Sequence, residues 1–195
     1  MAINKDMEKW EKQEGVKFLR RIGLKLNQTV LDFGCRVGHY TIPAAKVVGD
    51  KGIVYAVDKE QQVLDELQQK VAGLNLKNIR IINTLGRIKL PLESRTVDVV
   101  LFYDVLHYHK KKERKKLYVE AYRVLKQDGL LSVYPKHSME DDPIMEFQDM
   151  GMESIKREIQ DSNFAFSKQH CGLISHDDGL NQGCILNFIK YKEKD

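Results

Sequence analysis

Short runs of apolar and β-branched residues alternate along the chain with segments whose apolar positions recur at helical spacing. Such runs predict strands, and apolar residues three and four positions apart predict helices. Strands are expected at residues 30–33, 53–57, 79–82, 97–102 and 130–134. Helices are expected at 40–48, 61–71, around 117–125 (closed by Asp128-Gly129) and 152–159. This alternation indicates right-handed crossovers and a mostly parallel sheet.

The two ends of the chain depart from this rhythm. Residues 1–23 precede the first strand and predict one amphipathic helix that carries Trp10 and Phe18. Near the other end, the strand-like runs 164–168 and 185–190 are joined by a stretch rich in Gly, Asp and Asn, which is typical of an antiparallel hairpin at a sheet edge. The expected fold is therefore α/β: a Rossmann-like, doubly wound, mostly parallel sheet with a C-terminal antiparallel hairpin.

Length and composition indicate one globular domain. The chain has 195 residues, of which 42% are hydrophobic and 31% charged, which excludes intrinsic disorder. We expect a single domain over 1–195, with residues 1–23 as a helical cap and 24–195 as the core. No apolar run approaches the roughly 18 residues of a membrane span, and the first six residues lack the apolar stretch of a secretory signal.

Charge and cysteines narrow the function classes further. The net charge of +4 is too weak to demand a nucleic acid, and we interpret the basic run 109–116 as a solvated helix face. Cys35, Cys171 and Cys184 are too few and too scattered for a disulfide framework, and no C-x-x-C pair is present. A reducing, cytoplasmic location is expected.

The chemistry is expected just beyond the carboxyl ends of the strands, where open α/β sheets bind their ligands. After the first strand, glycines at 34 and 38 permit a tight turn that aims the next helix's N–H groups at a ligand. After the second strand stands Asp58, a carboxylate suited to both hydroxyls of a ribose. Together these features predict a ligand that contains a nucleoside.

The same loop distinguishes between nucleoside ligands. A dinucleotide fingerprint starting at Gly34 requires glycines at the positions of Arg36 and His39. Asp32, two residues before Gly34, instead suits a ligand whose near end is cationic. S-adenosylmethionine, with its sulfonium and ammonium groups, fits this pattern.

Four ordered segments then carry a family resemblance: 30–38, 54–59, 90–91 with 97–107, and 122–131. They resemble the motifs of class I S-adenosylmethionine-dependent methyltransferases, most closely the type-11 or ubiquinone/menaquinone-biosynthesis-like group. The resemblance covers roughly residues 30–134 and implies a seven-stranded sheet with a C-terminal hairpin. It also implies cofactor contacts at the following positions: Asp32, Gly34, Cys35, Arg36, Gly38, Asp58, Lys59, Leu85, Phe102 and Tyr103.

Two positions differ from that family. Arg36 replaces the usual middle glycine of the first motif, and Leu85 stands where an aspartate usually accepts the adenine amino group. Losing such a partner costs about 1 kcal/mol of binding. Cys35 is expected to be a small packed residue, while Phe102 and Tyr103 suit cofactor contact, through backbone or ring, and core packing equally well.

The expected function is in-line transfer of a methyl group from S-adenosylmethionine to a small-molecule acceptor. Two alternatives remain open: a binding or regulatory protein that has lost turnover, and an RNA methyltransferase. The sequence predicts neither the acceptor nor the oligomeric state.

The sequence also identifies no catalytic base. In the segment 107–109 an exposed histidine is the simpler expectation, and His137 and His170-Cys171 are further candidate bases. A magnesium site from Asp104 and Asp141-Asp142 has no distinctive spacing, so no metal is expected.

Overall fold

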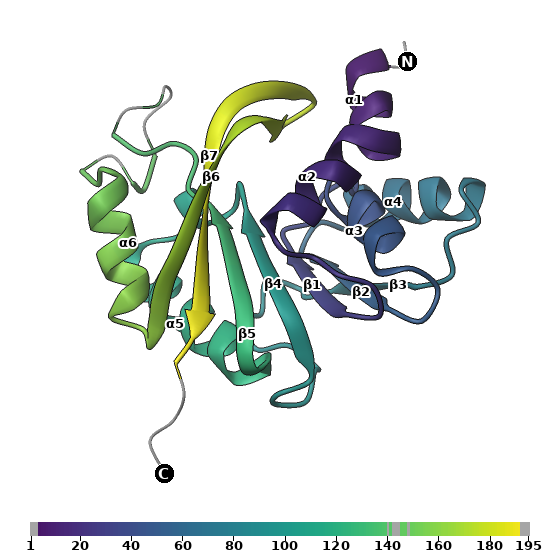
Figure 1. Cartoon of the computed structure of the whole chain (residues 1–195). Coiled ribbons are helices and arrows are strands. Elements are labelled where there is room, and N and C mark those ends of the chain that lie inside the picture. Colours follow the sequence, from purple (N-terminus) through teal and green to yellow (C-terminus); the bar gives the residue numbers. More distant parts are fainter. Residues whose placement is uncertain (1–3, 140, 142–144, 148, 192–195) are drawn as a thin grey trace. The chain divides into compact units, whose positions relative to one another are not determined.

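Seven strands form a mixed sheet in the order β3-β2-β1-β4-β5-β7-β6. Pairing is parallel among β1, β2 and β3 and between β4 and β5, and antiparallel between β5 and β7. This arrangement confirms the α/β class and the C-terminal antiparallel hairpin (Figure 1).

The computed structural model describes residues 4–139, 141, 145–147 and 149–191. Its elements are α1 (Lys5–Lys9), η1 (Trp10–Glu14), α2 (Gly15–Ile22), β1 (Thr29–Phe33), α3 (Thr41–Val48), β2 (Ile53–Asp58), α4 (Gln61–Gly73), β3 (Ile79–Asn83), β4 (Val97–Tyr103), η2 (Leu106–Tyr108), α5 (Lys111–Val124), β5 (Leu125–Tyr134), α6 (Met152–Gln160), β6 (Phe164–His176) and β7 (Gly179–Lys190). Among these described helices, none combines the length and the apolar character needed to cross a bilayer.

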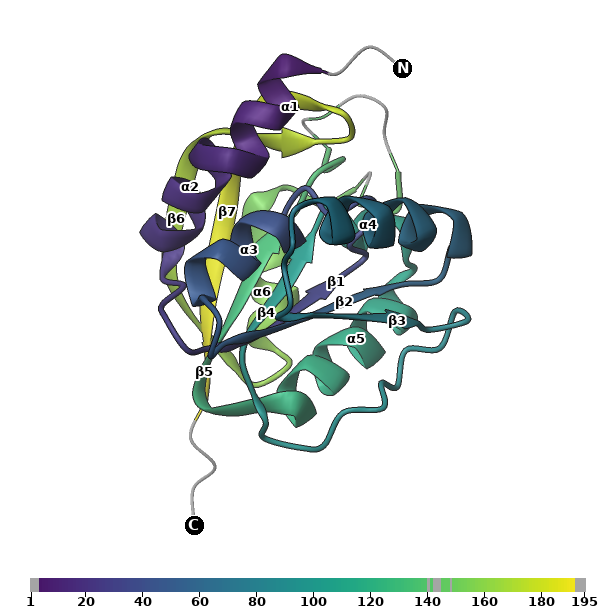
Figure 2. The ribbon, with the colours of Figure 1, turned by 90° about the vertical axis from the view of Figure 1, so that its right-hand side faces the viewer.

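The chain divides into two compact units. The first comprises Met1–Arg87 with Gly172–Gly183, the turn region of the hairpin. In it, α3 and α4 lie on one face of β1, β2 and β3 (Figure 2). The apolar stripe of α4 (Leu64, Leu67 and Val71) is buried, as its helical spacing predicts.

The second unit comprises Ile88–Cys171 with Cys184–Asp195. The parallel pair β4 and β5 forms its centre, with β7 antiparallel to β5 and α5 in contact with β5. β4 is buried along almost its whole length. This burial explains why its sequence is a continuous apolar run without alternation.

The N-terminal segment is helical from Lys5 to Ile22, but its middle is a π-helical turn, η1. Wide turns of this kind often occur at functional positions. Here the turn carries Trp10, whose indole Nε1 donates to the carbonyl oxygen of His39 at 2.8 Å. Trp10 and Phe18 are buried and their rings lie 5.6 Å apart.

The structure corrects the expected end of the helix around residues 117–125, which is α5. α5 ends at Val124, and Asp128-Gly129, expected to close that helix, lie inside β5. The pairing with β4 shifts there, from Val97 opposite Leu125 to Val99 opposite Leu130. A bulge of this kind absorbs extra residues within a strand pair, so the strand begins before the apolar run that predicts it.

The hairpin is longer than its sequence pattern predicts. β6 and β7 extend through most of the Gly/Asp/Asn-rich stretch, and only Asp177 and Asp178 lie between them. The sequence predicts no disulfide framework, but two of the three cysteines pair. Cys171 and Cys184 form a disulfide because the hairpin places them opposite each other, with Cα atoms 4.1 Å apart.

Candidate functional site

The loop between β1 and α3 turns tightly around two glycines. Gly34 and Gly38 have φ angles of 80° and 90°, which residues with a side chain rarely adopt. The backbone N–H groups of Gly34 and Cys35 donate to the carbonyl oxygen of Val57 in β2, at 2.8 and 3.1 Å. A Cβ atom at Gly38 would collide with the side chain of Leu67 in α4. The glycines therefore let this loop lie against β2 and α4.

Asp58, the last residue of β2, is hydrogen-bonded to the same loop. Its Oδ2 accepts from the backbone N–H of Arg36 at 3.0 Å. Its Oδ1 accepts from the N–H groups of Lys59 and Glu60 at 2.7 and 3.1 Å. The carboxylate thus joins the glycine loop to the start of α4 and fixes its own orientation. This contact places Asp58 beside the glycine loop. Their joint role in binding a nucleoside stays a prediction.

Arg36 has a φ of 46°, which is uncommon for a residue other than glycine. Its guanidinium Nη1 lies 2.6 Å from Oδ1 of Asp177 in the hairpin turn, and both side chains are largely exposed. The arginine that replaces the usual middle glycine is therefore engaged by the hairpin turn.

The residues that follow Gly38 are also held by the hairpin turn. His39 contacts Glu11 through Nδ1 at 2.7 Å and Asp178 through Nε2 at 3.3 Å. The hydroxyl of Tyr40 donates to the carbonyl oxygen of Ser175 at 2.6 Å. The hairpin turn and the N-terminal helices thus fix the glycine loop from two sides.

Asp32, in β1, is a buried carboxylate. Its Oδ2 accepts a hydrogen bond from Oγ1 of Thr41, the first residue of α3, at 2.6 Å. Burial, with a smaller contribution from the nearby charge of Asp58, raises the pKa of Asp32 from 3.8 to about 7, although the Thr41 hydrogen bond and His39 act in the opposite direction. Because the Thr41 hydrogen bond offsets only part of the cost of burying the charged carboxylate, a cation close to Asp32 would stabilise that form.

Cys35 and Leu85 differ in exposure. Cys35 is buried, and burial raises the pKa of its thiol well above the ordinary value, so its thiolate is not available as a nucleophile. Leu85 has a φ of 50° and is 72% exposed. Its backbone N–H donates to Oδ1 of Asn83 at 2.8 Å. The loop after β3 therefore presents an apolar side chain to solvent at this position.

Phe102 and Tyr103 belong to the second unit, at the end of β4. Both rings are buried. Phe102 packs 6.5 Å from the ring of Tyr118, and the Tyr103 hydroxyl lies 2.7 Å from Oγ of Ser132. These side chains pack in the second unit; cofactor contact by Phe102 or Tyr103 stays a prediction.

The expectation of an exposed histidine after β4 is wrong for His107. This side chain is fully buried in η2, whereas Tyr108 is exposed and His109 is half-buried. His137 is also buried, and its ring packs against His107. The prediction was based on the polar residues next to His107 in the sequence. It could not include the contact with His137, which comes from a distant segment. His170 Nε2 lies 3.5 Å from Nδ2 of Asn187, in the hairpin.

The basic run is a solvated face of α5 apart from one residue. Its lysines are exposed, but Arg114 is buried and forms a two-point ion pair with Glu158 of α6, at 2.7 and 2.8 Å. Within the part of the chain that the structure describes, this run therefore also anchors α6. Asp142, one member of the magnesium set considered above, lies outside the described residues, and Asp141 pairs with Lys136.

Sequence reasoning missed four side chains that shape the first unit: Glu11, Thr41, Asp177 and Asp178. Thr41 follows the glycine loop directly, so its position offered a signal. The other three contact the loop across 28 or more positions of sequence, and no local pattern marks them.

The fold and the loop together define a class: an α/β protein with a glycine turn after β1 and a carboxylate after β2, an arrangement that suits a nucleoside. A family model described as a methyltransferase domain matches residues 30–129. The chain belongs to this methyltransferase domain family.

Individual relatives agree with the family. A demethylmenaquinone methyltransferase from Lactobacillus johnsonii is 31% identical over 117 residues, covering 60% of this chain and 47% of the relative. A protein of the same name from Bacillus mycoides is 33% identical over 91 residues, covering 47% and 36%. The chain thus matches less than half the length of these curated relatives.

Among solved structures, a SAM-dependent methyltransferase from Aquifex aeolicus superimposes with a TM-score of 0.75 at 25% identity. The superposition covers 94% of this chain and 93% of the Aquifex aeolicus chain. These matches confirm the resemblance to class I methyltransferases of the ubiquinone/menaquinone group.

Proposed function

We propose that the chain is an S-adenosylmethionine-dependent methyltransferase that acts on a small-molecule acceptor. The observation that carries the proposal is the glycine loop bonded to Asp58, with Asp32 buried beside it. The family match and the names of the relatives support the same reaction class.

The residues of the first unit suit such a cofactor. An ionised carboxylate offers about four lone-pair sites, and three backbone N–H groups bond to Asp58, which leaves capacity for a ribose hydroxyl. Asp32 would favour the cationic end of the cofactor over a pyrophosphate. Gly34, Cys35 and Lys59 would contact the adenosyl group by backbone packing, because their N–H groups already donate to Val57 and Asp58.

When bound, the cofactor supplies a methyl carbon already activated by positive sulfur. The protein's part is to orient the acceptor in line with that carbon and to exclude water, and orientation alone can supply about 7–11 kcal/mol. A general base matters only for an acceptor that arrives protonated. No residue is assigned that role here.

The alternative of a regulatory protein without turnover rests on Arg36 and Leu85. The contact between Arg36 and Asp177 weakens this alternative, because the guanidinium has a partner in the hairpin turn. No specific observation favours an RNA substrate over a small molecule.

Isothermal titration calorimetry tests the proposal directly. We expect S-adenosylmethionine and S-adenosylhomocysteine to bind the purified chain with one equivalent, and NAD to give no heat at the same concentration. Absence of heat with both adenosyl ligands at millimolar concentration would reject the proposal.

We also propose a cytoplasmic location. Its support is the buried free thiol of Cys35, whereas the Cys171–Cys184 disulfide of the structure is typical of an oxidising compartment. In the cytoplasm the Cys171–Cys184 pair would be reduced. Acid trapping and alkylation of cell lysates should then label both cysteines, whereas an unlabelled pair would argue against this location.

A further inference from the structure

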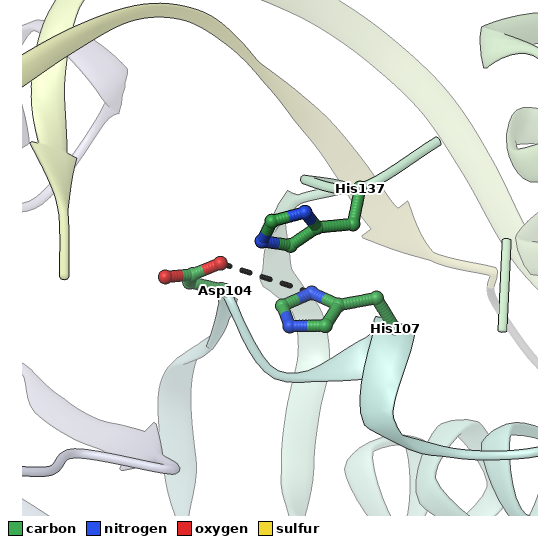
Figure 3. Close-up of side chains that lie close together, drawn as sticks. All are labelled: Asp104, His107 and His137. Atoms are coloured by element: carbon green, nitrogen blue, oxygen red, sulfur yellow. Dashed lines mark ion pairs between the residues drawn. The ribbon is translucent and has the colours of Figure 1, made fainter. Parts of the chain in front are cut away.

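Three side chains with metal-ligating atoms meet at the carboxyl ends of β4 and β5. Asp104 directly follows β4, His107 lies in η2, and His137 follows β5 by three residues. The two strands are parallel neighbours, with Tyr103 opposite Tyr134, so their ends lie side by side. All three side chains belong to the second unit and point toward one another (Figure 3).

The distances between these groups are short. Oδ1 of Asp104 lies 3.7 Å from Nδ1 of His107. The imidazole rings of His107 and His137 meet edge to face with their centroids 4.5 Å apart. One ligand atom from each residue lies within 4.8 Å of the other two. Ligands about 2.1 Å from a tetrahedral ion are roughly 3.4 Å apart, so the observed separations exceed that spacing by about 1.4 Å at most.

The surroundings hold these groups in place and away from bulk water. His107 is 0% exposed and His137 is 6% exposed, while the Asp104 side chain is 14% exposed. The ring of Tyr108 covers the imidazole of His107, with centroids 4.1 Å apart. A carboxylate that faces two largely buried imidazoles offers a bound cation one negative charge and two nitrogen donors away from bulk water.

The backbone gives a second indication of a built arrangement. Asp104 and His137 have φ angles of 55° and 58°. Positive φ is uncommon outside glycine and persists only where the surrounding structure fixes it. Backbone of this kind can store strain at a binding site, and here both residues belong to the same three-residue group.

We propose that Asp104, His107 and His137 bind one divalent transition-metal ion, with Zn²⁺ as the reference ion. Two imidazole nitrogens and one carboxylate oxygen match the preferences of zinc, iron(II) and similar ions, whereas magnesium and calcium prefer oxygen ligands. Three protein ligands leave a fourth position for water or an anionic oxygen. This proposal concerns ion binding alone and does not depend on the methyl-transfer reaction.

The sequence alone did not indicate this site. His137 is separated from Asp104 and His107 by about thirty positions, and no standard ligand spacing joins them. Asp104 was considered with Asp141 instead, but the Asp141 carboxylate is bonded to Lys136 and to the backbone of Ser138.

Metal titration of the full chain, freed of ions with a chelator, tests the proposal. We expect one equivalent of Zn²⁺ to bind in competition with a chromophoric chelator, and Mg²⁺ at millimolar concentration not to displace it. His107→Gln and His137→Gln should each weaken Zn²⁺ binding at least tenfold. The matched control His109→Gln, at a half-buried histidine outside the group, should leave the affinity unchanged.

A measurement on the unmodified chain guards against variants that fail to fold. In histidine NMR spectra, Zn²⁺ should shift the imidazole signals of His107 and His137 but not that of His109. The proposal is overturned if the unmodified chain binds no Zn²⁺, if folded His137→Gln keeps full affinity, or if the signals of other histidines shift instead. Failure of this test would leave the cofactor-binding test of the proposed function unaffected.

Discussion

The buried carboxylate of Asp32 makes the stability of this protein depend on pH. Its pKa is about 7 in the folded chain against an ordinary value of 3.8. The folded state therefore holds a proton there that the unfolded state has lost, and between these values stability falls as pH rises. At about 1.4 kcal/mol per pH unit, the cost of the charged form reaches about 4 kcal/mol above pH 7.

Replacing Asp32 by Asn removes this cost while keeping an oxygen that accepts from Thr41. Below about pH 3 the carboxyl is protonated in both states, so the advantage of Asp32→Asn is small there. Between pH 5 and pH 8 its advantage over the unmodified chain should grow by about 3 kcal/mol. For a chain of this length that corresponds to about 6–12 °C in melting temperature.

Thermal unfolding at pH 5 and pH 8, followed by circular dichroism, measures this difference. Asp50→Asn, at an exposed aspartate in the turn between α3 and β2, is the matched control, and its difference in melting temperature from the unmodified chain should be the same at both pH values. If the difference in melting temperature between Asp32→Asn and the unmodified chain is the same at both pH values, the Asp32 carboxyl is not buried as described.

Three further substitutions test the contacts around the two units. Gly38→Ala should lower the free energy of unfolding, measured by urea titration, by about 2 kcal/mol or more, because Gly38 has a positive φ and the Leu67 side chain lies close to it. The control Gly73→Ala, which has open space around it, should not lower this free energy. Glu158→Gln should cost about 3 kcal/mol or more, since it leaves the buried Arg114 guanidinium without its charged partner; a loss below 1 kcal/mol would contradict this. Arg36→Ala removes an exposed ion pair and should change stability by less than about 1 kcal/mol in the same assay.

Much of the fold could be predicted because its strands are short apolar runs separated by amphipathic helices. The glycine loop was also predictable, since Gly34 and Gly38 occupy the positions with positive φ that the turn requires. Asp58 followed from its place at the end of β2. These features depend on local backbone preferences and on the order of elements, both of which a single sequence contains.

Other features depend on contacts between distant segments. His107 is buried with the ring of His137 packed against it, and the Cys171–Cys184 bond depends on the register of the hairpin. The contact between Arg36 and Asp177 spans 141 positions. No local periodicity encodes such pairs. The one-domain organisation likewise stays a prediction.

The central claim is that Asp58 and the glycine loop hold an adenosyl group. Its most direct test is the dissociation constant of S-adenosylhomocysteine, measured by calorimetry for the unmodified chain, for Asp58→Ala and for the exposed-site control Asp50→Ala. We predict that Asp58→Ala weakens binding at least tenfold while Asp50→Ala binds normally, with Asp58→Asn checking that the loop still folds. Equal dissociation constants for folded Asp58→Ala and the unmodified chain would contradict the claim.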